Sequence, residues 1–391
     1  MRIAFFSNFL NHHQLPLCQA FLKHAGEDFI FVATERIPED RLKMGYEDMN
    51  TYPFVLRSYE NEESGKKAYE VAENYDVVIF GASPVKFLQK RMQDNKLTFR
   101  FCERSLKKGT WRRFIPRTRK KIYEGYTRYK NDKLYVLGAS AYASYDLSLC
   151  GFQEDKCLRW GYFPRIKQND IDALMVGKKN NAKVEILYAG RLLKLKKVMD
   201  TVQAVRCLIK KNIFNLQFTI IGDGPEKAKI EQYIQKHRLE KYIKILPFMK
   251  PEEVRIYMDK ADIYVFGSNY YEGWGAVMNE AMNSACAMLV SHAVGSAAYL
   301  IEQDKNGFIY PCGNIKRLTE LLRLLIMNPE KREQIGRKAY ETITQTWTAE
   351  VAAERFLQLC EAIENDRDYK NLFKDGPCSL AGVLKKALKE V

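Results

Sequence analysis

Residues 261–280 decide the fold class of the second half of the chain; they read ADIYVFGSNYYEGWGAVMNE. Ile263–Phe266 is a bulky apolar run typical of a buried strand, and a helical pattern begins near Ala276. Between them, Gly273 and Gly275 free the backbone to come close to a ligand. A strand, a glycine-containing loop and a helix together indicate a parallel sheet covered by helices.

The same alternation of short apolar runs and helical patterns extends over most of the chain, so the predicted fold class is α/β with two doubly wound domains. The expected strands are Arg2–Ser7, Phe29–Ala33, Phe54–Leu56, Val77–Gly81, Thr98–Cys102, Leu134–Leu137, Val184–Ala189, Gln217–Ile221, Ile243–Leu246, Ile263–Phe266, Met288–Ser291 and Phe308–Tyr310. We expect a first domain at 1–165, a polar linker at 166–183 and a second domain at 184–345. A C-terminal helical segment at 346–391 follows the second sheet, and it is a candidate to pack back on the first domain.

Composition excludes several classes of protein. The 391 residues are 46% apolar, 12% aromatic and 28% charged, which is typical of a globular chain and excludes a disordered one. No run approaches ~18 apolar residues, so no membrane-spanning helix is expected. The apolar run in the first ten residues is too brief for a signal peptide. Nine scattered cysteines without a CxxC pair indicate reduced thiols, so we expect a cytoplasmic protein.

The positive charge is concentrated in one segment. The formal net charge is +15, and residues 81–130 hold sixteen Lys and Arg against three Asp and Glu. Between Lys107 and Lys130 these cations alternate with Trp111, Phe114 and several tyrosines. Such a mixture suits an anionic membrane surface or single-stranded nucleic acid, or it is a solvated helix whose rings face its own core. Charge alone does not decide among these three.

Two glutamates flank the loop that follows Ile263–Phe266. If the segment between them is helical, Glu272 and Glu280 lie ~12 Å apart, too far for a carboxylate pair acting on one bond. The spacing suits two hydroxyl-bearing groups held on either side of a phosphate. Backbone N–H groups at Gly275, Ala276 and Val277 would then form a phosphate seat at the helix start. The alternative is that both glutamates are ordinary helix residues.

A second group of residues follows Val184–Ala189. Gly190-Arg191 ends that strand, and Lys196 comes five residues later. A guanidinium and an ammonium at one sheet edge can neutralise a diphosphate. Gly222-Asp223-Gly224-Pro225 is another strand-to-helix turn, with Pro225 expected at the first helical position. No Rossmann glycine fingerprint or Walker motif is present, so a nicotinamide enzyme or an ATPase has no support.

Taken together and in this order, these motifs resemble the family 4 glycosyltransferases. The resemblance rests on Gly-Arg…Lys at 190–196, Gly-Asp-Gly-Pro at 222–225, Ala261-Asp262 and Glu-x7-Glu at 272–280, and it covers residues 184–310. It implies the GT-B fold, in which two Rossmann-like domains face each other across a cleft. In the first domain only the architecture is similar. Ala285 and Ala287 replace a glycine and a proline that are usual in the family, which puts that turn in doubt.

The resemblance also implies a reaction and roles for residues. It implies retaining transfer of a sugar from a nucleotide diphosphate sugar, with no cofactor and no divalent metal. Arg191 and Lys196 would bind the diphosphate, Glu280 the ribose, and Glu272 the transferred sugar as a catalytic residue. The remaining donor-binding positions are the backbone of Trp274, Gly275, Ala276 and Val277, and, near the base, Phe248 and Met249.

In the first domain, polar residues follow the predicted strands. The loop after Arg2–Ser7 contains Asn8, Asn11, His12 and His13, candidates for binding a phosphate or an acceptor hydroxyl. Either histidine, His13 included as a catalytic candidate, could instead cap the next helix. Glu103 could orient or deprotonate an acceptor hydroxyl, or form an ion pair with Arg104 or Lys107. In a retaining transfer the departing phosphate can itself take the acceptor proton.

The sequence therefore predicts a glycosyltransferase that extends a glycan or a lipid-linked acceptor in cell-surface polysaccharide synthesis. Its expected partners are a nucleotide sugar, that acceptor and the anionic inner membrane surface through residues 81–130, with no specific nucleic acid. The expected location is the cytoplasm, peripheral to the inner membrane face. The alternatives are a nucleotide-sugar epimerase or hydrolase of the same fold, a basic nucleic-acid-binding protein, and a catalytically silent partner subunit.

Overall fold

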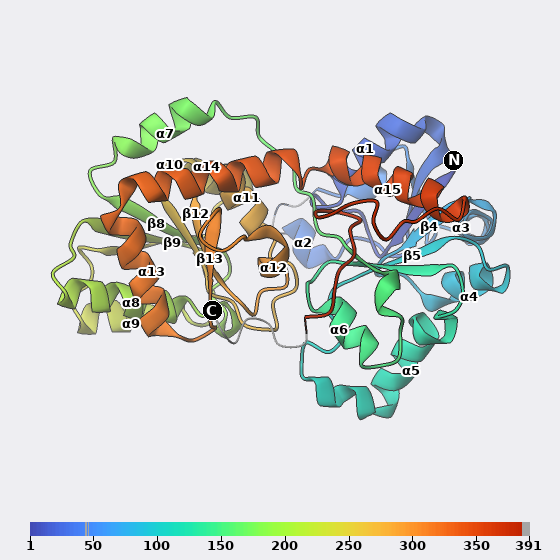
Figure 1. Cartoon of the computed structure of the whole chain (residues 1–391), viewed down its shortest axis with the longest axis horizontal. Coiled ribbons are helices and arrows are strands. Elements are labelled where there is room, and N and C mark those ends of the chain that lie inside the picture. Colours follow the sequence, from blue (N-terminus) through green and yellow to red (C-terminus); the bar gives the residue numbers. More distant parts are fainter. Residues whose placement is uncertain (44, 46, 385–391) are drawn as a thin grey trace. The chain divides into compact units, whose positions relative to one another are not determined.

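The chain forms two compact units (Figure 1). The computed structural model describes residues 1–43, 45 and 47–384. Unit 1 consists of Met1–Arg165 together with the chain from Trp347, and unit 2 consists of Ile166–Thr346. Of the C-terminal segment expected at 346–391, residues 385–391 lie outside the described residues.

Unit 1 is built on a parallel sheet of seven strands in the order β3-β2-β1-β4-β5-β6-β7. The strands are β1 (Ile3–Ser7), β2 (Phe29–Ala33), β3 (Val55–Arg57), β4 (Val77–Phe80), β5 (Thr98–Cys102), β6 (Leu134–Gly138) and β7 (Cys157–Arg159). The first six were predicted, whereas β7 was not. Because β1 pairs with both β2 and β4, the order of strands reverses at β1, and a crevice is expected beyond its carboxyl end.

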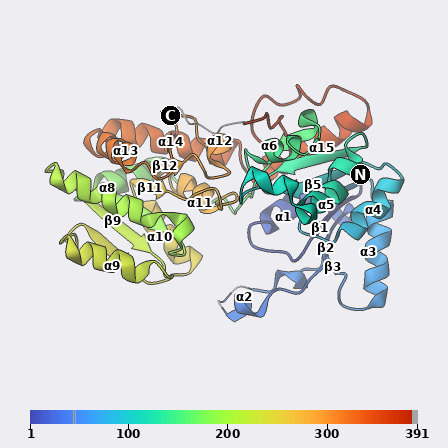
Figure 2. The ribbon, with the colours of Figure 1, turned by 90° about the horizontal axis from the view of Figure 1, so that it is seen from below.

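Helices cover both faces of the unit 1 sheet (Figure 2). They are α1 (Leu15–Ala25), α2 (Glu39–Lys43), α3 (Glu62–Asn74), α4 (Val85–Gln93), α5 (Pro116–Gly125), α6 (Ala143–Ser148) and α15 (Ala349–Glu364), with short 3-10 helices η1 (Gly26–Asp28), η2 (Met49–Thr51), η3 (Thr110–Phe114), η4 (Thr127–Tyr129) and η5 (Glu154–Lys156). The late helix α15 packs on α1, where the rings of Phe21 and Phe356 meet at 5.5 Å. The segment after the second sheet thus completes the core of unit 1.

Unit 2 is built on a parallel sheet of six strands in the order β10-β9-β8-β11-β12-β13. The strands are β8 (Val184–Ala189), β9 (Leu216–Ile221), β10 (Ile243–Leu246), β11 (Ile263–Phe266), β12 (Ala287–Ser291) and β13 (Gly307–Tyr310). All six were predicted. The strand order reverses between the central strands β8 and β11, which places a crevice beyond their carboxyl ends.

The helices of unit 2 form two layers. They are α7 (Ile171–Lys179), α8 (Val198–Lys210), α9 (Lys227–Lys236), α10 (Pro251–Lys260), α11 (Val277–Asn283), α12 (Ala297–Leu300), α13 (Ile315–Met327) and α14 (Pro329–Gln345), with the 3-10 helix η6 (Lys194–Lys196). Figure 1 shows α8, α9 and α13 on one side of the sheet and α10, α11 and α14 on the other. A buried aliphatic core joins the first layer to the sheet.

The stretch expected as a linker at 166–183 is part of unit 2. It contains α7, whose first turn is capped by the Asp170 side chain. The Lys178 side chain on α7 is buried and donates to the Ala261 carbonyl. The stretch is polar in sequence, but the apolar stem of a lysine can be buried, so polarity alone does not reveal that this segment packs within unit 2.

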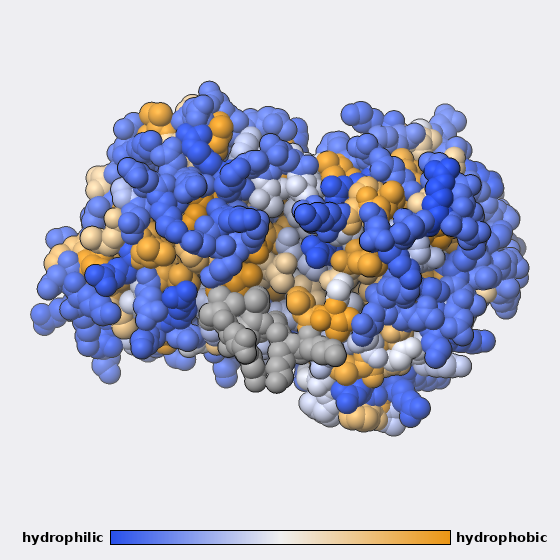
Figure 3. All heavy atoms as spheres, in the orientation of Figure 1, coloured by the Kyte–Doolittle hydropathy of each residue, from blue (hydrophilic) through white to orange (hydrophobic). Residues whose placement is uncertain are grey.

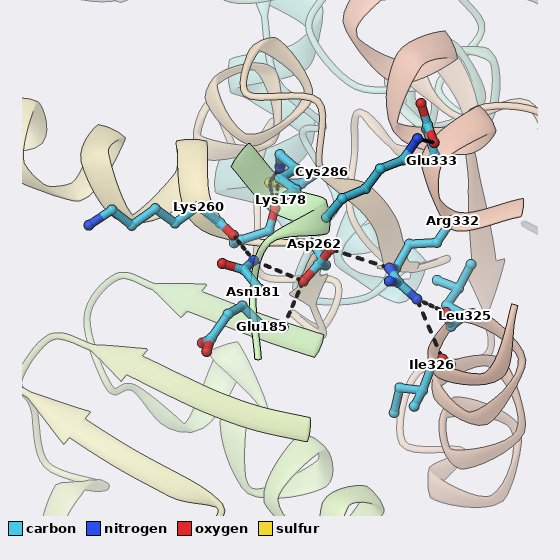
Figure 4. Close-up of polar contacts among 12 residues, drawn as sticks. Lys178, Asn181, Glu185, Lys260, Asp262, Cys286, Leu325, Ile326, Arg332 and Glu333 are labelled. Carbon is cyan, nitrogen blue, oxygen red and sulfur yellow. Dashed lines mark hydrogen bonds and ion pairs between the residues drawn. The ribbon is translucent and has the colours of Figure 1, made fainter. Parts of the chain in front are cut away.

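Asp262 ties several elements together at the amino end of β11 (Figure 4). Its Oδ2 accepts from the Glu185 backbone N–H at 2.8 Å and from the Asn181 side chain at 3.3 Å. Its Oδ1 accepts from Arg332 Nε on α14 at 3.3 Å. Asp262 lies at the opposite end of the strands from the crevice. Its place in the motif at 261–262 is therefore explained by structure alone.

Gly336 on α14 packs against the turn between α11 and β12, and replacing it should destabilise unit 2. A Cβ at Gly336 would lie 2.4 Å from the carbonyl oxygen of Ala285, whose φ is +51°. We expect Gly336→Ala to lower the free energy of unfolding by about 1–3 kcal/mol, because backbone must shift to make room. Gly177→Ala is the control, because nothing lies within 4 Å of its Cβ position. It should be neutral or slightly stabilising in the same urea titration; equal effects of the two would contradict this packing.

Candidate functional site

The loops after β8 and β9 pack closely and are hydrogen-bonded to each other at the crevice of unit 2. Leu192 N–H donates to the Asp223 carbonyl at 2.8 Å, and Gly190 N–H donates to the Ile221 carbonyl at 3.0 Å. Gly222 has φ +143°, and a Cβ there would lie 2.1 Å from the Gly190 carbonyl oxygen. The glycines of both predicted motifs thus serve close packing. Pro225 is not the first helical residue, because α9 begins at Lys227.

Lys196 and Glu272 are brought together by the structure. Lys196 lies in η6 after β8, and Glu272 lies in the loop after β11. Lys196 Nζ is 2.5 Å from Glu272 Oε2, and the side chains are only 18% and 14% exposed. The same ammonium lies 5.2 Å from the centroid of the Phe266 ring. Two of the predicted site residues therefore form one largely buried ion pair above the end of β11.

Helix α11 begins within one residue of the start near Ala276 that the sequence predicted, but Glu272 is not part of the helix. Helix α11 begins at Val277, so Glu272 stands five residues before it, and the ~12 Å helical spacing to Glu280 does not hold. Gly275 has φ +82°, outside the helical region, which prevents an earlier start. A Cβ at Gly275 would lie 2.4 Å from the Phe266 ring, so only glycine fits there.

The Trp274 side chain belongs to the core of unit 2. It is 1% exposed, and its Nε1 donates to Asn279 Oδ1 at 2.9 Å. Its carbonyl accepts from the Ser296 hydroxyl at 2.5 Å. Only the backbone near Trp274 remains for a ligand role, as the sequence analysis expected of the stretch through Ala276 and Val277.

Glu280 is half-buried on α11. Burial raises the pKa of its carboxyl above the usual range, while Arg255 on α10 lowers the pKa and Glu252 raises it. The Glu280 charge in turn contributes to the raised pKa of Tyr264, whose hydroxyl bonds the backbone of Ala189. Glu280 therefore lies near the end of β8, a position that the sequence spacing did not reveal.

The remaining predicted donor residues lie on the surface of unit 2. Arg191 is exposed directly after β8, and its carbonyl accepts from the Tyr188 hydroxyl at 3.0 Å. No carboxylate pairs with the Arg191 guanidinium within the described residues. Phe248 is 61% exposed before α10, and Met249 is half-buried. A cavity of about 230 Å³ lies beside η6, lined by Lys194, Lys197 and Glu226 among others.

Hydrogen bonds that the sequence did not predict join three loops of unit 2. Tyr270 lies two residues before Glu272, and its hydroxyl is 2.7 Å from His292 Nε2 after β12. His292 Nδ1 accepts from the Cys312 backbone N–H after β13 at 2.9 Å, which leaves Nε2 to carry the proton when the ring is neutral. No local motif connects residues so distant in the chain, so the sequence gives no sign of this contact.

In unit 1 the loop after β1 is held by its own side chains. Asn11 Nδ2 donates to Gln14 Oε1 at 2.7 Å, and Asn11 Oδ1 accepts from the His13 backbone N–H at 3.0 Å. Asn8 accepts from the Ser7 hydroxyl at 3.2 Å. The ring centroids of His12 and His13 are 3.8 Å apart with the ring planes tilted by 48°, and His13 Nδ1 is buried without a hydrogen-bond partner within the described residues. Neither histidine caps α1 through its side chain.

Glu103 forms the ion pair that was its alternative role. Its Oε2 is 3.0 Å from Lys107 Nζ, and its Oε1 accepts from the Tyr162 hydroxyl at 3.3 Å. Arg104 instead pairs with the fully buried Asp146 at 2.9 Å. Glu103, Asn8 and Asn11 line a cavity of about 780 Å³ that lies within unit 1, beyond the ends of β1, β4 and β5.

No group of three or more His, Cys, Asp or Glu side chains in the described part of the chain is arranged to hold a metal ion. Within the same residues, no helix is long and apolar enough to cross a membrane.

His13 should make stability depend on pH. Burial, and then the charges of His12 and Arg41, lower its pKa from 6.5 to about 3. The folded state therefore binds fewer protons than the unfolded state, so the contribution of neutral His13 is fully present above pH 6.5 and lost as pH falls towards 3. Between pH 7 and pH 5 we expect a loss of about 1–2 kcal/mol of unfolding free energy through this residue.

Urea titrations at both pH values would test the His13 prediction. His13→Asn should reduce the pH 7 to pH 5 difference. The exposed His24 gives the control, since His24→Asn should leave the difference as in the wild type. An unchanged difference in His13→Asn would show that His13 titrates normally in the folded protein.

Comparison with known proteins fits this architecture. Residues 172–342 match the family model for glycosyl transferases group 1, so unit 2 is a glycosyltransferase group 1 domain. The alpha-monoglucosyldiacylglycerol synthase of Acholeplasma laidlawii is 30% identical over 257 residues, which cover 64% of this chain and 58% of that protein. The poly(ribitol-phosphate) alpha-N-acetylglucosaminyltransferase of Staphylococcus aureus is 25% identical over 44% of this chain and 34% of that protein.

A solved structure shows the same fold over nearly the whole chain. The HepE protein of Anabaena, crystallised with UDP, has a TM-score of 0.68 at 17% identity and covers 93% of this chain and 100% of its own. The two parallel-sheet units thus have the GT-B fold, as predicted. The chain spans little more than half the length of the first curated relative and less of the second.

Proposed function

We propose that this protein is a retaining glycosyltransferase that moves a sugar from a nucleotide diphosphate sugar to a lipid-linked or glycan acceptor. The observation that carries the proposal is the Lys196–Glu272 pair, 2.5 Å apart beside the exposed Arg191 and the end of β8. A cation pair and a carboxylate at a topological switch point suit a diphosphate joined to a sugar. The family match over residues 172–342 and the name of the Acholeplasma relative support the same reaction class.

The proposed mechanism needs little side-chain acid–base chemistry. Arg191 and Lys196 would hold the diphosphate and stabilise its charge as the sugar–oxygen bond breaks. Glu272 would orient the sugar, and Glu280 the ribose. The acceptor oxygen forms the new bond on the same face, and its proton passes to the departing diphosphate. Because two cations take the role that a divalent metal has in other transferases, activity should persist in EDTA.

The first test is a thermal-shift panel of UDP-, GDP- and ADP-sugars. A ligand that binds only the folded protein raises its melting temperature by mass action. The stabilising donor is then incubated with membrane extract and the products are followed by mass spectrometry. Sugar consumed without any acceptor would instead indicate a hydrolase or epimerase, and no shift with any nucleotide sugar would contradict the proposal.

We further propose that unit 1 contacts an anionic membrane surface through η3 and α5. Trp111, Phe114 and Tyr123 are 60%, 71% and 53% exposed, while Tyr126 and Tyr129 are buried. The rings of this segment thus divide between surface and core. Figure 3 shows hydrophobic beside hydrophilic surface over this part of unit 1. Exposed rings with flanking cations suit the headgroup region.

Sedimentation with liposomes would test the membrane contact. Wild type should pellet with phosphatidylglycerol liposomes at low salt and be released at high salt. Exchanging Trp111, Phe114 and Tyr123 for serine should weaken binding without a change of charge. Absence of binding at low salt would remove the membrane proposal and leave the enzyme proposal intact.

A further inference from the structure

The cavity within unit 1 carries a strong excess of positive charge. Eight of its lining side chains are Lys or Arg, and only Glu103 among them is acidic. Glu103 neutralises Lys107, and Asp146 neutralises Arg104. The other six cations are supplied by α2, by β5, by the loop after β5, by η3 and by α5. This excess of positive charge favours the binding of an anion in the cavity.

Five of these cations have no carboxylate partner in the part of the chain that the structure describes. They are Arg100, Lys108, Arg112, Arg117 and Lys121. Like charges gathered around one hollow repel one another, which opposes folding unless a counterion enters. Their convergence is thus better explained by a ligand than by the stability of unit 1.

Arg100 is the deepest of the five. It lies in the middle of β5 and is 8% exposed, and its guanidinium stands 5.2 Å from the centroid of the Tyr126 ring. Its Nε and Nη1 are buried and have no hydrogen-bond partner within the described residues. Burying a charged donor without a partner is costly, and a ligand that accepts both hydrogen bonds removes that cost. Arg100 therefore brings two unpartnered donors to the wall of the cavity.

We propose that the unit 1 cavity binds a phosphate or diphosphate ester carried by the acceptor. The unpartnered Nε and Nη1 donors of Arg100 can each donate to a phosphate oxygen, and the surrounding cations match a group of more than one negative charge. A cavity of about 780 Å³ has room for a diphosphate and a sugar together. The inference depends on the proposed function only in naming the ligand as the acceptor.

The placement of η3 and α5 connects this cavity to the proposed membrane contact. Arg112 and Arg117 of these elements line the cavity, while Trp111 and Phe114 are exposed to solvent. One short segment thus presents cations to the cavity and rings to the outside. This is the arrangement that a phosphate ester with an apolar tail would require.

Calorimetric titration with inorganic pyrophosphate would test the site. The full chain carries Lys196→Ala, so that the proposed donor site does not contribute. Arg100→Met should weaken pyrophosphate binding by about tenfold or more, the scale of a lost hydrogen bond to a charged group. Because Arg100 is buried, a second variant is needed: Arg117→Gln with Lys121→Gln, both exposed on α5 and both lining the cavity.

The control changes the same net charge on the same helix. Arg119→Gln with Lys120→Gln removes two cations of α5 that do not line the cavity. The lining pair should weaken binding by about tenfold and the control pair by less than about twofold. Equal weakening by the two pairs, or glucuronate binding as tightly as pyrophosphate, would overturn the proposal.

Competition by anionic vesicles identifies the source of the phosphate, and an assay of sugar transfer tells failure of this inference from failure of the proposed function. If the phosphate belongs to a lipid headgroup, anionic vesicles should compete with pyrophosphate; if it belongs to a soluble glycan, they should not. Both results leave the site standing. Failure of the proposed function would appear as absent sugar transfer with pyrophosphate binding intact, whereas failure of this inference would appear as intact transfer without specific binding.

Discussion

Replacing Lys196 by alanine should reduce sugar transfer by about a thousandfold or more while leaving unit 2 folded. The ammonium is 18% exposed and faces both Glu272 and the Phe266 ring, so its charge acts in a partly desolvated place. Losing a preorganised cation removes stabilisation of the departing diphosphate. The measurement is turnover of the stabilising nucleotide sugar, together with circular dichroism to check folding.

Lys194→Ala is the matched control, because Lys194 lies in the same 3-10 helix and its side chain is exposed. It should retain turnover within about threefold, in line with an ordinary surface substitution. Glu280→Ala should also lose most transfer if it holds the ribose. A folded Lys196→Ala variant with turnover like that of the wild type would refute the assignment of the donor site.

Gly275→Ala should both destabilise unit 2 and impair donor binding. An alanine there must adopt φ near +82°, and its Cβ would meet the Phe266 ring at 2.4 Å. The first effect costs about 1 kcal/mol and the second about 1–3 kcal/mol more. Because Phe266 also lies beneath Lys196, moving its ring disturbs the ion pair, and we expect donor affinity to fall about tenfold or more.

The variant Gly313→Ala separates the cost of the positive φ from the effect of the contact with the Phe266 ring. Its φ is +80°, nearly the same as that of Gly275, but nothing lies within 4 Å of its Cβ position. Gly313→Ala should therefore show only the cost of the positive φ, about 1 kcal/mol, with unchanged donor affinity. Urea unfolding and calorimetry with the donor measure both quantities. Indistinguishable variants would mean that the contact with Phe266 has no effect.

The order of strands and helices along the chain could be predicted from the sequence, whereas the edge strand β7 of the unit 1 sheet could not. Strand β7 has three residues, too few for a recognisable pattern. Its backbone is hydrogen-bonded to a segment more than two hundred residues later. Arg159 N–H donates to the Ser379 carbonyl at 2.7 Å, and Cys378 N–H donates to the Arg159 carbonyl at 2.8 Å. Pairing across more than two hundred residues leaves no local signal.

The candidate site was predicted in part. The residue types at the strand ends were recognised because their spacing places them at one edge of a parallel sheet. The helix start near Ala276 was predicted, but the conditional helical spacing from Glu272 to Glu280 does not hold, because Gly275 has a positive φ and packs against the Phe266 ring. The Tyr270–His292 contact joins loops that only the folded sheet brings together. Ala285 shows the converse: it adopts φ +51° and makes the turn where a glycine was expected.

The return of α15 to unit 1 has a consequence for biosynthesis. Among the described residues, unit 2 is the single stretch Ile166–Thr346, whereas unit 1 is assembled from chain on either side of that stretch. The ribosome therefore synthesises residues 166–346 of unit 2 before the α15 segment of unit 1 emerges. Until then the aromatic surface around Phe21 and Phe99 lacks Phe356 and stays open to association with other nascent chains or to chaperone capture.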